Sequence, residues 1–340
     1  MAKLTIKILD KGFEFQQDEG DTLLRSALRA GLGFPYECNS GGCGSCKFEL
    51  VEGELEELWP DAPGLSPRDI RKGRKLGCQC IAKSDCTIKV NLEHHSAPES
   101  KPERIMVSFV EAKPLTSDMA EFVFKSASAA KFIPGQFALL SLPGVEGDRA
   151  YSMSNLPNNE GEWSFIIKKM PGGKGSTFIF DELKPGDSIE LDGPYGMAFL
   201  KTEIPREIVC IGGGSGLSPM VSIARAVTKD PQMAQHKMHM FYGGRGPKDI
   251  CTPAIVSAFG DIKDRLTCYN AVSDLDLARE QEWSGATGFI HELVEKELGS
   301  DLTNYEFYFC GPPPMTKAIQ KMLMVDHQVP FDQLHYDRFF

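Results

Sequence analysis

Three cysteines in one glycine-rich loop constrain the fold of this chain more than any other feature. Cys38, Cys43 and Cys46 stand in a C-x4-C-x2-C spacing. One class of [2Fe–2S] cluster binds three of its four thiolate ligands with this spacing. Three of the nine residues 38–46 are glycine, which reaches positive φ without a steric clash and so suits a loop that curls around two irons. The sequence therefore predicts an iron–sulfur cluster here.

The fourth ligand has to come from elsewhere in the chain. Cys78 and Cys80, in the run Leu76-Gly77-Cys78-Gln79-Cys80, can both supply it, and we take Cys78. A zinc site is the alternative interpretation. The spacing of the three cysteines and the three glycines among them match the usual paired C-x2–4-C zinc ligands poorly. We therefore predict Cys38, Cys43, Cys46 and Cys78 as ligands of one [2Fe–2S] cluster.

Length, charge and cysteine content limit what else the chain can be. A chain of 340 residues is expected to form two or three domains. Its formal net charge of −10 makes nucleic acid and anionic membranes poor partners. It has no run of eighteen apolar residues, so we expect no bilayer-spanning segment, and its start lacks the apolar core of a signal peptide. Ten cysteines are too sparse for a disulfide scaffold, and reduced thiols indicate the cytoplasm.

The pattern around the cysteine loop is that of a small mixed α/β domain. Short strands are predicted at 3–8, 13–17, 47–51 and 86–92, with one helix that starts after Asp21-Thr22. Strands with one helix across them and a cluster loop at the edge resemble the β-grasp fold of plant-type ferredoxins. We assign residues 1–95 to this ferredoxin domain. Residues 96–103 are polar and contain proline, so we interpret them as a linker.

From residue 104 the pattern changes to short strands with turn signals about every dozen residues, which predicts an antiparallel β-barrel. The candidate strands are 105–112, 121–125, 137–142, 163–169 and 188–191. Within this region the run Arg149-Ala150-Tyr151-Ser152-Met153-Ser154-Asn155 resembles the R-x-Y-S-x-S-N flavin signature of the ferredoxin–NADP reductase superfamily. We therefore assign residues 104–203 to an FAD-binding barrel domain.

That resemblance implies roles for individual residues. Arg149 can hold the FAD pyrophosphate, Tyr151 can lie on the isoalloxazine ring, and Ser152 can hydrogen-bond flavin N5. The run 172–177 precedes an apolar helical stretch at 178–183, whose free N–H groups would meet phosphate. The run 193–196 matches the G-P-x-G turn that closes the family's barrel. The implied FAD contacts are Arg149, Ala150, Tyr151, Ser152, Ile166, Lys168, Gly175, Ser176, Thr177 and Phe340.

A third region, residues 204–340, carries a nucleotide-binding pattern. A strand at 207–211 leads through the glycine loop 212–216 into a helix, and such a loop binds pyrophosphate with backbone N–H groups. It is not the G-x-G-x-x-G fingerprint, because Leu217 occupies the third glycine position. Alternating strands and helices at 266–271, 289–298, 305–309 and 315–324 predict a doubly wound parallel sheet. We assign this region to an NAD-binding domain.

The last predicted strand ends in Phe309-Cys310-Gly311-Pro312-Pro313-Pro314-Met315. This run matches the C-G-P-x-x-M motif of the same superfamily, in which the cysteine lies near the reactive nicotinamide carbon. Ligands of such sheets bind outside the carboxyl ends of the strands, so both loops should open to one crevice. The implied nucleotide contacts are Gly212, Gly213, Gly214, Ser215, Gly216, Arg245, Cys310, Gly311 and Pro312. Ser152 and Cys310 are the candidate catalytic residues.

A ferredoxin, a flavin barrel and a nucleotide domain in this order resemble the reductase components of bacterial multicomponent oxygenases. The runs 34–44 and 59–65 and the terminal Asp337-Arg338-Phe339-Phe340 are similar to those of toluene monooxygenase reductases. The resemblance implies an NADH:ferredoxin oxidoreductase with FAD and one [2Fe–2S] cluster. It also implies delivery of single electrons to a Rieske-type ferredoxin, which feeds a di-iron hydroxylase for hydrocarbons. Phe340, with Phe339 beside it, is the candidate for an aromatic ring that shields the flavin.

Several alternatives stay open. Arg245 and Lys248 follow the second strand, where a 2′-phosphate would bind, whereas Asp249 and the family resemblance favour NADH over NADPH. The same modules could instead reduce a ring-hydroxylating dioxygenase or a deoxysugar dehydratase. A redox sensor that binds flavin and cluster without turnover is a further alternative.

Overall fold

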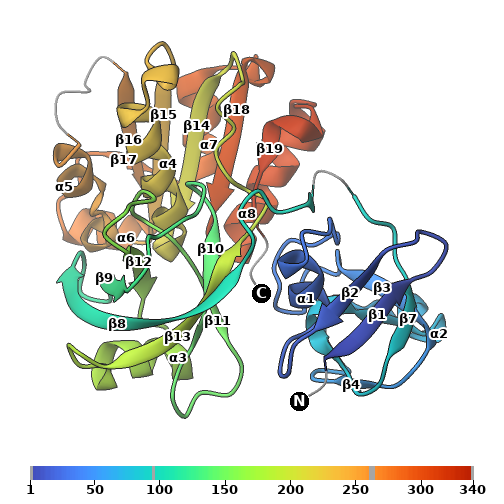
Figure 1. The fold of residues 1–340 in the computed structure, drawn as a ribbon. Coiled ribbons are helices and arrows are strands. Elements are labelled where there is room, and N and C mark those ends of the chain that lie inside the picture. The colour runs from blue at the N-terminus through green and yellow to red at the C-terminus, as the bar shows by residue number, and fades with distance from the viewer. Residues whose placement is uncertain (1–2, 94–95, 260–264, 338–340) are drawn as a thin grey trace. The chain divides into compact units, whose positions relative to one another are not determined.

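The computed structural model describes residues 3–93, 96–259 and 265–337. They form two compact units (Figure 1). The first unit holds the chain up to Arg104 together with Asp192–Met197 and Asp337, and the second holds Ile105–Leu191 and Ala198–Tyr336. The boundaries predicted at 95, 103 and 203 stay predictions. Among the described residues no helix is both long enough and apolar enough to cross a membrane.

The first unit is built on a five-stranded sheet with the order β2-β1-β7-β3-β5. Its strands are β1 (Leu4–Ile8), β2 (Glu14–Gln17), β3 (Lys47–Glu52), β5 (Arg74–Leu76) and β7 (Cys86–Lys89). Strands β4 (Leu55–Glu57) and β6 (Cys80–Ala82) form a separate pair, and α2 spans Pro67–Arg71. Helix α1 (Leu23–Arg29) begins where predicted, because the hydroxyl of Thr22 accepts the N–H of Arg25. Its apolar face is buried, and the predicted β-grasp fold is confirmed.

A six-stranded antiparallel sheet, nearly closed into a barrel, forms the first part of the second unit, although its residues Glu103–Arg104 and Asp192–Tyr195 are grouped with the first unit. Its order is β11-β10-β13-β8-β9-β12, with strands β8 (Glu103–Pro114), β9 (Met119–Ser126), β10 (Phe137–Ser141), β11 (Arg149–Ser152), β12 (Glu162–Lys168) and β13 (Ser188–Tyr195). The two terminal strands of this order, β11 and β12, approach each other where Met153 bridges Phe165. At this closure the N–H of Ser154 donates to the carbonyl of Ser164 at 2.7 Å.

One predicted feature of the barrel is wrong in detail. The segment 193–196 was expected to be a turn, but β13 continues through Tyr195. Gly196, with a φ of 106°, is the residue at which the strand ends. Gly193 and Pro194 are part of this strand, and Gly193 is not among the glycines with a positive φ. Tyr195 is fully buried, which keeps this part of the strand inside the protein.

The rest of the second unit is a parallel sheet with the order β17-β16-β15-β14-β18-β19. The strands are β14 (Glu207–Gly213), β15 (Met238–Gly244), β16 (Leu266–Val272), β17 (Ala286–Thr287), β18 (Tyr305–Cys310) and β19 (Leu334–His335). The helices are α4 (Leu217–Lys229), α5 (Thr252–Ser257), α6 (Leu275–Glu280), α7 (Ile290–Leu298) and α8 (Pro313–Gln320). This is the predicted doubly wound architecture.

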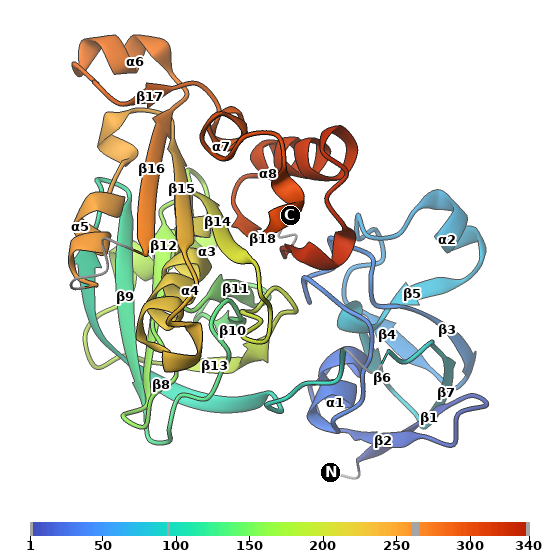
Figure 2. The same ribbon diagram turned by 90° about the horizontal axis from the view of Figure 1, so that it is seen from above.

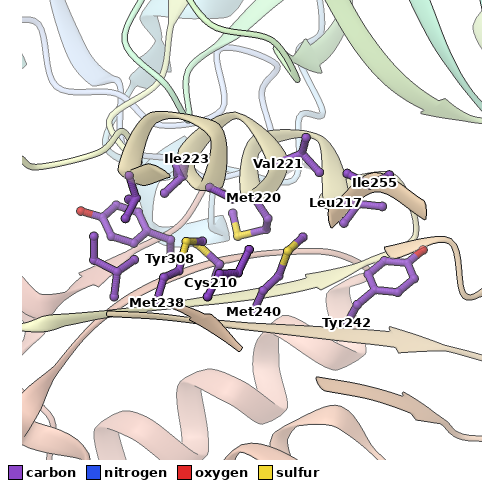
Figure 3. Packing of buried hydrophobic residues seen from close by; sticks show 14 of the residues in the cluster. Cys210, Leu217, Met220, Val221, Ile223, Met238, Met240, Tyr242, Ile255 and Tyr308 are labelled. Carbon is purple, nitrogen blue, oxygen red and sulfur yellow. The ribbon is translucent and has the colours of Figure 1, made fainter. Parts of the chain in front are cut away.

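Helix α4 is the main cover of one face of the parallel sheet. Its apolar residues Leu217, Met220 and Ile223 pack on Cys210 of β14 and Met240 of β15 (Figure 3). A second buried cluster, to which α7 and α8 contribute, covers the opposite face. Strand β14 lies between β15 and β18, so the direction of the strand order reverses beside it. Ligands of such sheets bind at this position, outside the carboxyl ends of the strands.

We predict a pH-dependent contribution to stability from His327. Its Nε2 lies 2.6 Å from Oε1 of Glu295 at the end of α7, and its Nδ1 lies 3.1 Å from the carbonyl of Ser300. The hydrogen bond with Glu295 raises the pKa of His327 above its usual value of 6.5. The pair therefore stabilises the fold fully below pH 6.5, and this stabilisation is lost as the pH rises through the folded-state pKa.

The measurement is denaturant unfolding of wild type and His327→Gln at pH 6 and pH 8.5. We expect the variant to lose up to about 1 kcal/mol at pH 6, the upper range for such partly exposed pairs, and less at pH 8.5. Arg279→Gln, which removes the exposed pair with Asp276 on α6, serves as the control because this pair involves no histidine. An equal loss for His327→Gln at both pH values would contradict the prediction.

Candidate functional site

The cysteine loop brings four sulfurs together in two pairs. Sγ of Cys46 lies 3.4 Å from Sγ of Cys78, and the thiols of Cys38 and Cys43 hydrogen-bond with each other. Backbone amides point at the same sulfurs. The N–H groups of Ser40 and Cys43 donate to Sγ of Cys38, both at 3.4 Å, and the N–H of Ser45 donates to Sγ of Cys43 at 3.4 Å. Such donors stabilise thiolate sulfur, so the loop is preorganised for a cluster.

The pairing of the sulfurs distinguishes between iron–sulfur and zinc. A zinc site needs four ligands around one ion, whereas the four sulfurs here form two separate pairs. Two pairs of thiolates fit two irons, each with two protein ligands. The hydrogen bond within each pair lowers the pKa of one thiol, to about 6 for Cys38 and below its usual value for Cys78, and raises the pKa of its partner, Cys43 or Cys46. One thiol of each pair therefore gives up its proton more readily, as metal binding requires.

The structure also separates the two candidates for the fourth ligand. Cys78 lies beside Cys46, whereas Cys80 belongs to β6 and pairs across to Glu57 of β4. Burial raises the pKa of Cys80 to about 12, so this thiol stays protonated. Cys80 is therefore a core residue of the small β4–β6 pair.

The candidate flavin residues converge on strand β11 and the start of helix α3 (Lys174–Thr177). The guanidinium of Arg149 donates through Nη1 to the carbonyls of residues 146–148, at 3.0, 3.0 and 3.2 Å. Its side chain covers Gly175, where a Cβ would lie 2.9 Å from Cγ of Arg149. A positive charge over the first turn of a helix is a suitable place for a pyrophosphate, so these residues fit FAD.

The other predicted flavin residues differ in burial and in whether their polar groups already have hydrogen-bond partners within the protein. Tyr151 is half-buried, and burial raises the pKa of its phenol to about 12. Ser152 is 9% exposed and ends β11. Ser176, in contrast, uses its hydroxyl inside the turn, where it accepts the N–H of Met170 and donates to the carbonyl of Gly173. Ala150 lies between Arg149 and Tyr151, Thr177 ends α3, and Ile166 and Lys168 lie on β12. The predicted Phe340 and its neighbour Phe339 lie outside the described residues.

The two predicted nucleotide loops touch each other at the carboxyl edge of the parallel sheet. A Cβ at Gly216 would lie 2.1 Å from the carbonyl oxygen of Cys310, so only glycine allows this approach. Gly213 is similarly close to Met315, with 2.6 Å between its would-be Cβ and Sδ. The segment from the end of β14 to Gly216 and the loop after β18 therefore form one surface. Gly212 and Gly213, predicted as loop residues, end the strand itself, because β14 runs to Gly213. Gly214 and Ser215 belong to the turn before α4, and Gly311 and Pro312 follow β18.

A charged cluster lies at the carboxyl end of β15. Nζ of Lys168 lies 3.2 Å from Oδ2 of Asp118 and 3.6 Å from Oδ1 of Asp249. Oδ2 of Asp249 accepts the N–H groups of Arg245 and Gly246, at 2.9 and 3.1 Å. Burial opposes ionisation, but these bonds and Lys168 lower the pKa of Asp249 below its usual value. Asp249 is thus a fixed anion beside the turn, and the side chain of Arg245 is 75% exposed.

One residue that the sequence reasoning missed connects the flavin and nucleotide regions. Ser218, in the first turn of α4, accepts the N–H of Ile166 at 3.0 Å and donates to the carbonyl of Ser152 at 2.6 Å. The only sequence signal was a serine two positions after the glycine loop. Nothing in the sequence says which strand such a hydroxyl meets.

Three family models match the chain in the same order as these sites. A 2Fe-2S iron-sulfur cluster binding domain matches residues 6–83, an oxidoreductase FAD-binding domain matches 107–199, and an oxidoreductase NAD-binding domain matches 210–321. The predicted fold class and the predicted cofactors are therefore confirmed.

Known proteins resemble the chain over its whole length. CarAd, a ferredoxin–NAD(P)(+) reductase of Metapseudomonas resinovorans, is 45% identical over 326 residues, which cover 94% of this chain and 95% of that protein. The ferredoxin–NAD(+) reductase component of an alkene monooxygenase system of Xanthobacter autotrophicus is 35% identical over 97% of this chain and 99% of that protein. The solved ferredoxin reductase in carbazole 1,9a-dioxygenase has a TM-score of 0.89 at 39% identity, and the match covers 100% of this chain and 99% of that one.

The sulfur geometry predicts different outcomes for two neighbouring cysteines. Cys78→Ala removes half of one sulfur pair, so we expect loss of the cluster from the folded protein. Cys80→Ala, the matched control, removes a thiol that is equally buried but outside the pairs, so we expect the cluster to be retained. Iron and sulfide content and visible absorption measure both results. Equal cluster loss in the two variants would contradict this assignment.

Proposed function

The chain belongs to the reductase components of oxygenase systems, within the ferredoxin–NADP reductase superfamily, and on that premise we propose that it passes electrons from NADH to a Rieske-type ferredoxin. One observation carries the proposal most directly. The helix that follows the glycine loop also holds the strand of Ser152, through the 2.6 Å bond from Ser218. The candidate nucleotide and flavin sites are thus parts of one compact unit.

The chain's own residues have distinct tasks in this transfer. When bound, FAD accepts a hydride and releases electrons singly, which connects a two-electron donor to a one-electron acceptor. Arg149 and the first turn of α3 bind the flavin's pyrophosphate, Tyr151 orients the ring, and the hydroxyl of Ser152 is the hydrogen-bond partner of N5. The touching loops of Gly216 and Cys310 bind the nicotinamide nucleotide at the edge of the same site.

The cysteine loop holds the cluster from which single electrons pass to the acceptor ferredoxin. A cluster of this type, at roughly −400 mV, lies well below Rieske centres at roughly −150 to +300 mV, so transfer to such a ferredoxin is downhill. Cys38, Cys43, Cys46 and Cys78 are the proposed ligands. The N–H groups of Ser40, Cys43 and Ser45 stabilise charge on the sulfurs of Cys38 and Cys43. None of the ten cysteines is in a disulfide, which supports a cytoplasmic location.

Two terminal oxygenases are candidates, and each has a specific observation in its favour. The motif matches and the alkene monooxygenase relative support a di-iron hydroxylase for hydrocarbons. The similarity to the ferredoxin reductase in carbazole 1,9a-dioxygenase supports a ring-hydroxylating dioxygenase. Product formation with one purified ferredoxin–oxygenase pair of each class discriminates between them.

We predict that NADH is preferred over NADPH. The fixed anion Asp249 lies beside the turn that follows β15, where a like-charged 2′-phosphate is repelled, although Arg245 is nearby. We expect kcat/KM for NADH to exceed that for NADPH by at least about tenfold, since this ratio needs only about 1.4 kcal/mol. Asp249→Asn should reduce the ratio. Asp276→Asn, which alters an exposed acid on α6, should leave it unchanged. A preference of the wild type for NADPH would reverse this conclusion.

The proposed route predicts separable activities in Cys43→Ser. Without the cluster, we expect the variant to lose reduction of cytochrome c by NADH by at least about a hundredfold. Reduction of ferricyanide by NADH should be retained, because ferricyanide takes electrons at the flavin. Both rates are measured by absorbance on flavin-loaded protein. Loss of both activities in folded, flavin-loaded protein would refute separate sites for the two steps. An absence of NADH oxidation in fully loaded wild type would refute the proposed function itself.

A further inference from the structure

One face of helix α4 carries polar side chains that bind the backbone of β11, the flavin strand, and of the residues that follow it. Ser218 donates to the carbonyl of Ser152 at 2.6 Å, Ser222 donates to that of Asn155 at 2.7 Å, and Arg225 donates to that of Ser154 at 2.7 Å. The spacing i, i+4 and i+7 places these three on one side of a helix. We call them the α4 seam. Its two serines are 1% and 0% exposed, so water does not compete for these bonds.

The seam meets the barrel at its closure. At the bridge between Met153 and Phe165, the antiparallel pattern makes the N–H of Ile166 and the carbonyl of Ser152 the facing backbone groups on one side. Ser218 engages both, since it accepts from Ile166 and donates to Ser152. The hydroxyl of Ser218, from the nucleotide-binding part, therefore bridges β11 and β12 where the barrel closes. One end of this bridge is Ser152, whose own hydroxyl is the candidate partner of flavin N5.

The position of Ser218 in the chain connects this closure to the nucleotide loop. Ser218 follows Gly216 by two residues. Gly216 lies against the carbonyl of Cys310, so closely that a Cβ at Gly216 would be only 2.1 Å from that carbonyl oxygen. Any rotation of the first turn of α4 would thus change both the loop and the barrel closure. Helix α4 (Figure 2) contacts β14, β15 and β18 of the parallel sheet and β12 of the barrel.

Building on the proposed function, we propose that Ser218 is a positioning residue for hydride transfer, because its hydroxyl fixes the strand of Ser152 relative to the loop that binds the nicotinamide. It does not touch the reacting atoms. Reaction rates depend steeply on such placement, and a misplacement of about 1 Å can slow a reaction about a hundredfold. Removing the hydroxyl should therefore slow the transfer step much more than it weakens nucleotide binding.

Rapid mixing of the flavin-loaded, cluster-loaded protein with NADH tests this role. For Ser218→Ala we expect the limiting rate of flavin reduction to fall at least about tenfold, with the apparent Kd for NADH within about threefold of wild type. Ser222→Ala is the matched control. It removes the same chemical group from the same helix, one turn farther from Ser152, and should change both values less than about threefold. Ser218→Thr keeps the hydroxyl and should restore most of the rate.

Amide hydrogen exchange of the flavin-free protein gives a readout that does not depend on activity. The N–H of Ile166 should exchange at least about tenfold faster in Ser218→Ala than in wild type, and Ser222→Ala should leave this amide protected. If Ser218→Ala does not fold, Ser218→Cys keeps the volume with a much weaker hydrogen-bonding group and replaces it in both experiments.

Two outcomes would overturn the inference. One is a rate of flavin reduction in Ser218→Ala or Ser218→Cys that equals that of Ser222→Ala. The other is a fall in rate that Ser218→Thr does not reverse, with unchanged exchange at Ile166. Either result leaves the proposed function intact, because that function fails only if NADH does not reduce the loaded wild type.

Discussion

The contact between the glycine loop and the carbonyl of Cys310 is the constraint on which the nucleotide-binding part depends. Because Gly216 has no Cβ, the loop after β14 can lie directly on the loop after β18. This contact sets where helix α4 begins, and α4 in turn covers one face of the parallel sheet and binds the flavin strand. Any side chain at Gly216 would force the two loops apart and disturb both sites together.

The division into two units matches a division in chemistry. Among the described residues, those that would handle the nucleotide and the flavin belong to the second unit, and the four cluster cysteines belong to the first. Each unit has its own sheet, and the sulfurs already have their amide donors without help from the second unit. The requirements of two-electron and one-electron chemistry are therefore met by separate sets of contacts, so substitutions can alter one set without the other.

Much of this architecture follows from local sequence rules. The spacing of the three loop cysteines, the Thr22 cap of α1 and the glycine run after β14 each depend on neighbours in sequence, and the structure places them as those rules require. The choice of Cys78 over Cys80 is different. Both cysteines are buried, and only the three-dimensional path of β6 shows which of them meets Cys46.

The features that the sequence did not indicate are those with long separations along the chain. Ser218 binds Ser152 and Ile166, which are 66 and 52 residues away, and a serine in a helix carries no mark of such partners. The expected turn at 193–196 failed for a related reason. Its glycine–proline pair is typical of turns, but the burial of Tyr195 and the neighbours of β13 decide that the strand continues.

The unequal burial of the four cluster cysteines has a further consequence. Cys38, Cys46 and Cys78 are buried, and Cys43 alone is partly open to solvent. Because tunnelling slows with distance, an acceptor protein that docked over Cys43 would come closer to a cluster sulfur than one that docked over the buried Cys46–Cys78 pair. Peroxide and dioxygen reach the same sulfur first. The opening that brings a redox partner close is thus also the point at which oxidative damage to the cluster begins.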